Sequence, residues 1–338
     1  MPMPSDSSLQ GWQGCRVLVT GASGFVGSHL TEALIRLGAH VRVFIRYTSR
    51  SSLGLLSDLP AAELDTLEIV RGDVRDYTAV REACRDVSHV FHLAALISIP
   101  YSYLHPEEVV ATNVTGTLNV LQAARETGAQ RIIHTSTSEV YGTAQSVPIA
   151  ETHPLHAQSP YAASKIAADK LAESFGCAYN LPVVTIRPFN TYGPRQSARA
   201  IIPTIITQAL TRNRVLVGSL EPRRDLTFVS DTVDAFLRAG LAEGVIGETM
   251  NLGGNEEISI GDLAELIIRL VGRPVQIVRD AQRLRPERSE VMRLWSDNRR
   301  AQQLLGWHPK VGLESGLQQT IDWIAAHLDR YQVGRYEV

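Results

Sequence analysis

The stretch Gly21-Ala22-Ser23-Gly24-Phe25-Val26-Gly27 decides the fold of this chain. It follows Arg16–Thr20, an apolar run typical of a buried strand, and it opens a helical pattern that reaches Leu37. Its three glycines allow a tight turn and a close approach of the backbone to a phosphate. The helix that follows offers unpaired N–H groups and the positive end of its dipole. A glycine triplet alone is weak evidence, but between a strand and a helix it predicts a dinucleotide-binding turn.

Short apolar runs and helical patterns alternate through the first half of the chain. This alternation implies a parallel sheet with helices on both faces, so we expect an α/β fold with a doubly wound, Rossmann-type sheet. The further strands are expected at Val41–Ile45, Leu67–Val70, His89–Ala94, Arg131–Thr135 and Val183–Arg187, and the helices at Thr78–Cys84, Glu107–Thr127 and Tyr161–Tyr179.

After about Asn190 the pattern changes, which predicts a smaller C-terminal α/β lobe for the substrate. The segment near Val229–Asn251 is expected to return to the main sheet. Residues 1–13 are interpreted as a flexible tail, 14–189 with about 229–255 as the cofactor domain, and 190–228 with 256–338 as the substrate lobe. Helices are expected in this lobe at Ile201–Thr211, Ile260–Val271 and Leu313–Leu328.

The composition is that of an ordinary globular protein. The 338 residues are 44% hydrophobic and 20% charged, with a formal net charge of −2. This balance argues against nucleic acid or a membrane surface as a partner, because both favour a basic excess. Three widely spaced cysteines without a CxxC pair indicate reduced thiols. With no apolar run long enough for a signal peptide or a membrane span, the expected location is the cytoplasm.

The end of the second strand normally selects between NAD and NADP, because an acidic residue there binds the ribose 2′-hydroxyl. Here Ile45 is followed by Arg46, with Arg50 nearby, and no carboxylate is present. A guanidinium suits a 2′-phosphate, so NADP is favoured over NAD. The alternative is that Arg46 stacks on the adenine or faces water. Asp73, after the third strand, is a candidate contact for the adenine.

Tyr161 and Lys165 are four residues apart and therefore share one face of a helix. A lysine ammonium at that spacing can lower the pKa of the phenol, so that Tyr161 could act as a base at neutral pH. The YxxxK spacing is common by chance. Its position after a dinucleotide turn, and after Thr137 at a strand end, favours a reaction centre. His153 and His156 lack partners at ligand spacing, so no metal site is expected.

Gly21–Gly27, Thr137, Tyr161 and Lys165 together resemble the extended short-chain dehydrogenase/reductase family, whose members act on nucleotide-activated sugars. The resemblance covers nearly the whole chain. It implies a tightly bound, regenerated NAD(P) and a homodimer built on the Tyr161 and Glu107–Thr127 helices. It also rests on Arg187-Pro188-Phe189-Asn190-Thr191-Tyr192-Gly193-Pro194, on Arg224-Asp225 ahead of Phe228-Val229-Ser230-Asp231, and on Arg285-Pro286.

Within that family, the motif Thr137-Ser138-Glu139-Val140-Tyr141-Gly142 resembles GDP-mannose-type 4,6-dehydratases and UDP-glucuronate decarboxylases. The 4-epimerases have serines and no acid there, and dTDP-glucose dehydratases usually have Asp at the place of Ser138. The resemblance implies that Tyr161 removes the sugar 4-hydroxyl proton, that Thr137 orients this hydroxyl, and that Glu139 takes the C5 proton. Water then leaves C6 with a proton from Glu139 or from a Ser138-held water, which gives a 4-keto-6-deoxy sugar.

The resemblance also implies the remaining contacts of the site. The stretches Arg195–Pro203, Gly218–Asp225 and Ala94–Tyr103 are similar to dehydratases of the legionaminic-acid pathway, and this similarity favours UDP-N-acetylglucosamine as substrate. A decarboxylase, a 4-epimerase and a non-catalytic nucleotide-sensing homologue stay open as alternatives. The implied substrate contacts are Tyr101 over the sugar, Asn190, Arg224 and Arg285 on the diphosphate, and Arg199 and Ile202 near the base. The implied cofactor contacts are Gly21, Ser23, Gly24, Phe25, Val26, Gly27, Arg46, Asp73, Val74, Leu93, Ala94, Ala95, Tyr161, Lys165 and Pro188.

Overall fold

The computed structural model describes residues 7–49 and 52–333. Its centre is a seven-stranded sheet in the order β11-β6-β5-β4-β1-β2-β3, and all paired neighbours are parallel. The order reverses between β1 and β4, and such a switch point opens a crevice at the carboxyl ends of the strands. The strands are β1 (Arg16–Thr20), β2 (His40–Arg46), β3 (Glu68–Gly72), β4 (His89–His92), β5 (Arg131–Thr135), β6 (Val183–Pro188) and β11 (Thr249–Leu252).

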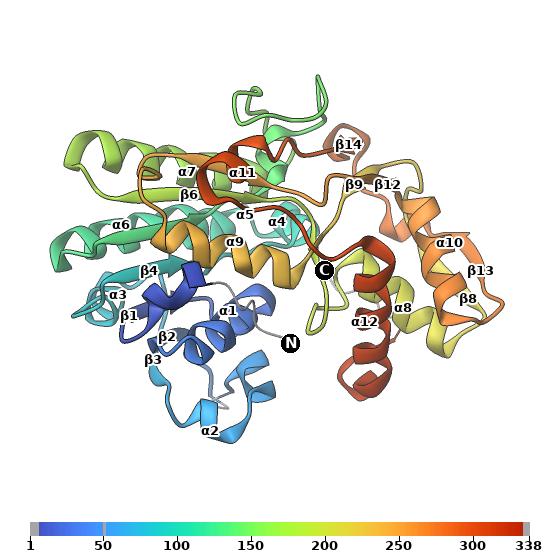
Figure 1. Ribbon diagram of the computed structural model, residues 1–338. Coiled ribbons are helices and arrows are strands. Elements are labelled where there is room, and N and C mark those ends of the chain that lie inside the picture. Colours follow the sequence, from blue (N-terminus) through green and yellow to red (C-terminus); the bar gives the residue numbers. More distant parts are fainter. Residues whose placement is uncertain (1–6, 50–51, 334–338) are drawn as a thin grey trace.

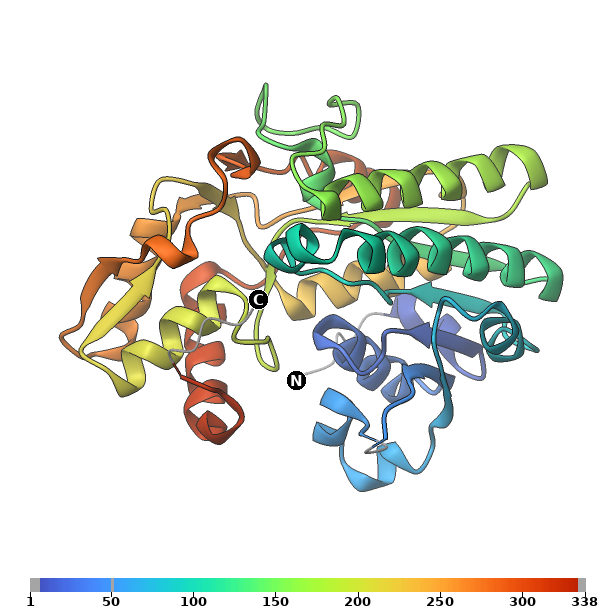
Figure 2. The same ribbon diagram turned by 180° about the vertical axis from the view of Figure 1, so that it is seen from behind.

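Helices cover both faces of this sheet, which confirms the predicted α/β class. The helices α1 (Phe25–Arg36) and α9 (Val229–Leu241) lie on the face toward the viewer in Figure 1. The helices α6 (Gly116–Thr127) and α7 (Pro160–Tyr179) lie side by side on the opposite face, which Figure 2 shows. The short α3 (Tyr77–Ala83) packs beside α6. As predicted, the segment after Val229 returns to the main sheet, through β11.

The elements of the small lobe gather at one end of the main sheet, on the right in Figure 1. They form three small sheets with the orders β12-β9-β14, β13-β8 and β10-β7. The predicted domain boundaries stay a prediction. The strands are β7 (Thr191–Tyr192), β8 (Arg214–Val217), β9 (Arg223–Asp225), β10 (Thr227–Phe228), β12 (Glu257–Ser259), β13 (Gln276–Arg279) and β14 (Arg293–Leu294), and the helices here are α8 (Ile201–Thr211), α10 (Ile260–Val271) and α12 (Leu313–Ala326).

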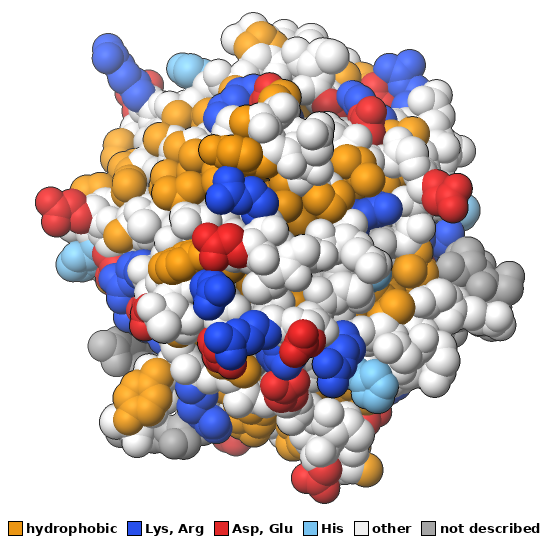
Figure 3. Space-filling view, turned by 90° about the vertical axis from the view of Figure 1, so that its left-hand side faces the viewer, with side chains coloured by type: hydrophobic (Ala, Val, Ile, Leu, Met, Phe, Trp, Pro, Cys, Tyr) orange, Lys and Arg blue, Asp and Glu red, His pale blue; other side chains and the backbone are white. Residues whose placement is uncertain are grey.

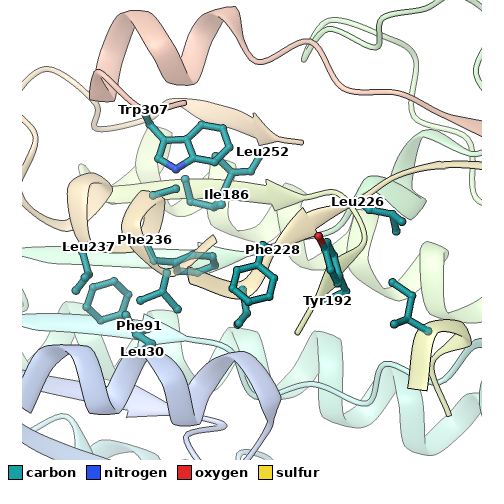
Figure 4. Close-up of a cluster of buried hydrophobic side chains, with 14 of the residues drawn as sticks. Leu30, Phe91, Ile186, Tyr192, Leu226, Phe228, Phe236, Leu237, Leu252 and Trp307 are labelled. Carbon is teal, nitrogen blue, oxygen red and sulfur yellow. The ribbon is translucent and has the colours of Figure 1, made fainter. Parts of the chain in front are cut away.

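A buried hydrophobic cluster runs from the main sheet toward the small lobe. Figure 4 shows Phe91 of β4 and Ile186 of β6 near Phe236 of α9, with Phe228 and Tyr192 continuing the cluster. These side chains are almost fully buried. The Tyr192 hydroxyl also donates a hydrogen bond to the carbonyl of Leu313, 3.2 Å away, at the start of α12. Close-packed apolar contacts of this kind leave little room for independent movement of the two parts.

The N-terminal segment differs from the prediction. Ser7–Trp12 form a 3₁₀ helix, and Leu9 and Trp12 are fully buried, so the flexible tail predicted over residues 1–13 is wrong from Ser7 onward. The two side chains are three residues apart, which is one 3₁₀ turn, and so they share a side. The Trp12 ring meets His89 edge-on with the centroids 4.9 Å apart. Residues 1–6 and Arg50 lie outside the described residues.

The helix predicted over Glu107–Thr127 is interrupted. It consists of α5 (Pro106–Val110), a π-helical turn (Ala111–Thr115) and α6. Asn113 in this turn is buried, and its amide bonds to both the N–H and the carbonyl of Leu96 and to the Ser164 hydroxyl. A π turn inserts one residue into a helix and often marks a functional position. Here it joins the loop after β4 to α7.

The surface at the end opposite the small lobe has mixed character. Figure 3 shows hydrophobic side chains over its upper half and charged side chains of both signs below them. Among the described residues, no helix is both long and apolar enough to cross a membrane.

Candidate active site

The glycine turn lies between β1 and α1, at the switch point of the sheet. Gly21 has a φ of +72°, and a Cβ there would lie 2.7 Å from the Ala94 nitrogen. A Cβ on Gly27 would lie 2.3 Å from the Gly21 carbonyl, so neither position tolerates a side chain. Gly24 is the N-cap of α1, and no side chain caps this helix. The N–H groups contributed by Phe25 and Val26 in its first turn are therefore suited to a pyrophosphate.

The ends of β2 and β3 form the side of the crevice predicted for the adenosine. Arg46 is 62% exposed and its guanidinium lies 3.6 Å from Glu108. Asp73 accepts two hydrogen bonds from the Arg75 guanidinium, at 2.9 and 2.6 Å, and these hold the pKa of Asp73 below its usual range. No acidic residue ends β2, as the sequence indicates. Ser23 lies in the glycine turn at the same side, and its carbonyl accepts from the N–H of Leu55.

The loop after β4 is tied to β1 through buried polar groups. The Thr20 hydroxyl accepts from the Ala94 N–H at 3.2 Å and lies 2.9 Å from Nδ1 of His92. Nε2 of His92 lies 2.9 Å from the Thr117 hydroxyl of α6. This chain of contacts orders Leu93, Ala94 and Ala95 at the crevice. Burial lowers the pKa of His92 well below its usual value, so its ring is neutral and packs as part of the scaffold.

Tyr161 and Lys165 lie in the first turns of α7, which Ser159 caps by accepting from the Ala162 N–H. Tyr161 is 6% exposed, and burial raises the pKa of its phenol, while a hydrogen bond with Thr137 opposes the rise. The Lys165 ammonium donates to the Thr135 carbonyl at 2.6 Å. Burial of the phenol dominates in the protein alone, and the lowering of the pKa of Tyr161 by Lys165 stays a prediction.

Thr137 and Glu139 form the wall opposite Tyr161. Thr137 caps the 3₁₀ helix Ser138–Tyr141 by accepting from the Glu139 N–H at 3.2 Å. Ser138 is buried and Glu139 half-buried. The Glu139 charge raises the pKa of Tyr161 and counteracts the lowered pKa of Arg224, so its carboxylate lies within electrostatic range of both groups. The structure thus brings the five predicted catalytic side chains to one place.

Two arginines of the small lobe converge on one carboxylate beside this wall. Arg224 of β9 lies 3.3 Å from Glu290, and Arg285 lies 3.5 Å from the same oxygen. Arg224 is only 6% exposed, and its burial lowers the pKa of its guanidinium. The Oδ1 atom of Asn190 and the Nη1 atom of Arg285 are buried without a hydrogen-bond partner. The Arg285 nitrogen is a donor and fits an anionic ligand, whereas the Asn190 oxygen is an acceptor and would need a donor from the ligand.

The two tyrosines of α4 (Ile99–Leu104) have different hydrogen-bond partners. Tyr101, predicted over the sugar, donates to Glu108 at 2.5 Å and so points toward the Arg46 side. The Tyr103 hydroxyl lies 2.6 Å from the Ser289 hydroxyl, and the charges of Arg285, Glu290 and Glu139 all act on its pKa. Tyr103 is therefore the tyrosine on the side of Arg285 and Glu290, and the predicted position of Tyr101 over the sugar stays a prediction. Its spacing of two from Tyr101 puts the two side chains on different helix faces, a signal available in the sequence.

The other predicted residues occupy more peripheral positions. Arg199 is exposed before α8, 3.4 Å from the Ser197 hydroxyl, and Ile202 packs in the hydrophobic core. Val74 is buried after β3, and Pro188 ends β6 beside β11. His153 accepts from the Gln145 N–H at 3.0 Å. Their predicted roles in binding stay predictions.

A parallel sheet of this strand order, with a glycine turn after β1 and with Tyr161 and Lys165 four residues apart on α7, is typical of the extended short-chain dehydrogenase/reductases. The model of the GDP-mannose 4,6-dehydratase family matches residues 18–320, and the chain belongs to this family. It is thus an enzyme of the NAD-dependent nucleotide-sugar dehydratase and epimerase class.

Its relatives span three reactions. A UDP-glucose 4-epimerase of Mycolicibacterium smegmatis is 36% identical over 317 residues, which are 91% of this chain and 98% of the relative. UDP-glucuronic acid decarboxylase 1 of Xenopus tropicalis is 32% identical over 331 residues, which are 95% of this chain and 75% of the relative. The structure of DesIV, a dTDP-glucose 4,6-dehydratase from Streptomyces venezuelae with NAD bound, is 30% identical with a TM-score of 0.83, covering 94% and 99% of the two chains.

Proposed function

We propose that this protein is a nucleotide-sugar 4,6-dehydratase and that UDP-N-acetylglucosamine is its substrate. The observation that carries the proposal is the position of Glu139 beside Thr137, which hydrogen-bonds Tyr161, together with the effect of the Glu139 charge on the pKa of Tyr161. Tyr161 handles the proton of the sugar hydroxyl, so Glu139 as an additional acid has a role only if a second proton is transferred. Elimination of water from C6 requires such a proton, taken from C5.

In the proposed reaction, Tyr161 takes the proton of the sugar 4-hydroxyl, which Thr137 orients. When bound, a nicotinamide cofactor would supply the hydride acceptor for C4 and the hydride donor for C6. The 4-ketone acidifies the C5 proton, and Glu139 removes it. The C6 hydroxyl leaves as water with a proton from Glu139 or from a water held by Ser138. After hydride addition to C6, C5 takes up a proton equivalent to the one that Tyr161 removed from the 4-hydroxyl. The sum of these steps is then the loss of one water, with the cofactor regenerated.

Substrate binding is assigned to the small lobe. Arg224, Arg285 and Asn190 would hold the diphosphate, and the two arginines would exchange their contacts with Glu290 for contacts with the ligand. The choice of UDP-N-acetylglucosamine follows the resemblance to legionaminic-acid-pathway dehydratases. Arg199 and Ile202 are proposed near the base.

A 4-epimerase is the second candidate, because the relative from Mycolicibacterium smegmatis is an epimerase at 36% identity. Against it stands Glu139, which would have no task in a reaction that only removes and returns one hydride. A UDP-glucuronate decarboxylase shares the Thr-Ser-Glu pattern and stays open as an alternative.

One experiment separates these candidates. The protein is incubated separately with UDP-N-acetylglucosamine, UDP-glucuronate and GDP-mannose, and each product is weighed by mass spectrometry. Dehydration removes about 18 mass units and decarboxylation removes about 44. Epimerisation leaves the mass unchanged, and NMR of the sugar detects it. Loss of water from UDP-N-acetylglucosamine is expected. A product of unchanged mass with inverted C4 would refute the proposal.

We also propose that NADP is preferred over NAD. The support is Arg46, which ends β2 with 62% of its side chain exposed where an acid would bind the ribose hydroxyl. Equilibrium dialysis of both cofactors against wild type and Arg46→Ala tests this. The variant should lose NADP affinity and keep NAD affinity, and equal losses of both would contradict the proposal.

The family resemblance further leads us to propose a cytoplasmic homodimer. Cys15, Cys84 and Cys177 are unpaired, as in a reducing compartment. The dimer face would be built on α6 and α7, which lie side by side in Figure 2. Light scattering after gel filtration should give twice the mass of one chain, and a monomer would count against it.

A further inference from the structure

Asp169 is a buried carboxylate that the proposed reaction does not use. It lies one turn after Lys165 on α7 and is 5% exposed. Its oxygens accept hydrogen bonds from His134 Nε2 at 3.0 Å, from the Ser136 hydroxyl at 2.8 Å and from Arg187 Nη2 at 3.0 Å. A carboxylate with this many partners is bound far more firmly than helix packing requires.

The partners of Asp169 come from the strand ends that build the reaction centre. His134 is in β5 and Ser136 follows it, on either side of the Thr135 carbonyl that receives Lys165. The next residue after Ser136 is Thr137. Asp169 therefore ties α7 to the same strand end that presents the Thr135 carbonyl and Thr137. A shift of Asp169 would move both relative to Lys165.

Arg187 joins this arrangement from β6. Its Nη1 donates to the Tyr141 hydroxyl at 2.8 Å, and that hydroxyl donates to Asn251 Oδ1 at 2.8 Å. The guanidinium is thus held on both sides, by Asp169 and by Tyr141. Because these hydrogen bonds fix the Arg187 guanidinium, Arg187 in turn fixes the position of the Asp169 carboxylate.

Asp169 is also the negative charge that acts on Lys165 from its own helix. Burial lowers the pKa of Lys165 from 10.5 to about 8, and the charge of Asp169 opposes this fall. Burial lowers the pKa of His134, so this ring is neutral at pH 7. The titratable and charged groups around Lys165 and its partner Asp169 are Tyr161 and Asp169 of α7, His92 of β4, His134 of β5, Arg187 of β6, and Glu139, whose charge acts on Tyr161.

We propose that Asp169 is a positioning residue of the reaction centre. Its carboxylate joins α7 to the ends of β5 and β6 and supplies the buried negative charge that keeps Lys165 protonated in a water-poor site. The inference deepens the proposed function, and it rests on that function for the part that Lys165 plays in the reaction. Removing the carboxylate lets Lys165 lose its proton at lower pH.

The chain is well suited to a direct test, because it contains three lysines, Lys165, Lys170 and Lys310. The side chains of Lys170 and Lys310 are 60% and 46% exposed, so their titration serves as an internal control. Protein with ¹³C,¹⁵N-labelled lysine is titrated by NMR in wild type and in Asp169→Asn. The Lys165 signal is assigned with Lys170→Arg and Lys310→Arg.

The Lys165 midpoint should fall in Asp169→Asn by about one pH unit or more, the size expected when an opposite charge nearby is removed. Asp169→Glu keeps the charge and should restore most of the wild-type midpoint. An unchanged midpoint in Asp169→Asn, or a Glu variant as low as the Asn variant, would overturn the inference. A merely structural role would not move this titration in a folded variant.

If Asp169→Asn does not fold because Arg187 is left unpaired, the double variant Asp169→Asn/Arg187→Gln removes both charges. Its Lys165 midpoint should still lie below that of wild type, and a midpoint equal to wild type would overturn the inference. The NMR titration uses no substrate, so its result is independent of whether the enzyme dehydrates UDP-N-acetylglucosamine. Failure of the mass experiment would leave the titration result standing, and the reverse also holds.

Discussion

Each half of the molecule contains a deeply buried aspartate, and the pKa values of the two are shifted in opposite directions. Asp169, in the cofactor half, meets Arg187 and two side-chain donors. Although burial alone would raise it, the hydrogen bond from His134 and the nearby cations hold the pKa of Asp169 below its usual range. Asp225, in the small lobe, is fully buried and accepts backbone N–H groups of Ser296 and Gly254. Burial raises the pKa of Asp225 to about 7.

The difference shows that neighbours, and not burial itself, decide the charge of a buried acid. It also separates two kinds of site. The reaction centre is assembled from Thr137 to Asp169, close in sequence and joined by buried hydrogen bonds. The small lobe draws Arg224 and Arg285 from distant segments onto one carboxylate. Changes in the first should act on the chemical step, and changes in the second on substrate binding.

The largest effect is expected from Tyr161→Phe, which removes the proposed base from the reaction centre. Hydride transfer should slow by about 10²–10⁴-fold, the range for loss of general base catalysis. Stopped-flow absorbance of the reduced cofactor at about 340 nm measures this step. Tyr179→Phe, on the exposed end of the same helix, is the control and should keep normal turnover. Near wild-type activity in Tyr161→Phe would refute the assigned role.

Glu139→Gln should stop the reaction after the first hydride transfer. The reduced cofactor and the 4-ketone should accumulate, while water loss falls by about 10²-fold or more. Mass spectrometry of the nucleotide sugar and absorbance of the cofactor report the two steps separately. Glu107→Gln, an exposed change on α5, is the control. Unchanged turnover of Glu139→Gln would remove the argument for a dehydratase over an epimerase.

A smaller effect is expected in the lobe. Arg285→Ala should raise KM by about tenfold or more and leave kcat nearly unchanged, because a hydrogen bond to a charged group contributes about 1.5–3 kcal/mol. Arg288→Ala, three residues away and exposed, is the matched control. Steady-state kinetics of both variants decide the matter. Equal changes in the two, or a fall of kcat alone in Arg285→Ala, would contradict the proposed diphosphate contact.

The same substitution in the two halves should change stability with opposite dependence on pH. The lowered pKa of Asp169 means that its contribution is present above an unfolded pKa of 3.8 and is lost as the pH falls through the folded value. Asp169→Asn should therefore cost about 3–5 kcal/mol at neutral pH, as when a buried ion pair is broken. The raised pKa of Asp225 means that wild type loses stability as the pH rises through about 7.

As the pH rises from about 5 to about 8, the unfolding temperature of Asp225→Asn should therefore increase relative to that of wild type, because only wild type loses this stability. Thermal unfolding of both variants and wild type at matched pH values measures these differences. A constant difference for Asp225→Asn across this range would show that Asp225 does not change its charge there.

Much of the fold could be predicted because its signals are local. The strands, the glycine turn and the Tyr161–Lys165 spacing each lie within one element or one connection, where hydrophobic period and glycine position are direct evidence. The short strands β9, β12 and β14 could not be predicted, because two or three residues carry no period. The burial of Leu9 and Trp12 was not predicted either, because two apolar residues in a short polar segment form no recognisable hydrophobic pattern.

The sequence by itself indicated the family, the glycine turn and the proposed catalytic set, because these depend on residue types at fixed spacing. Only the tertiary structure placed Tyr103 beside Ser289 and Tyr101 beside Glu108. Only it showed that Asp169 meets His134, Ser136 and Arg187. The physical reason is that spacing along one element fixes which side chains share a face. Which distant face they meet, and so which charges and hydrogen bonds they find, is set by how the elements pack together.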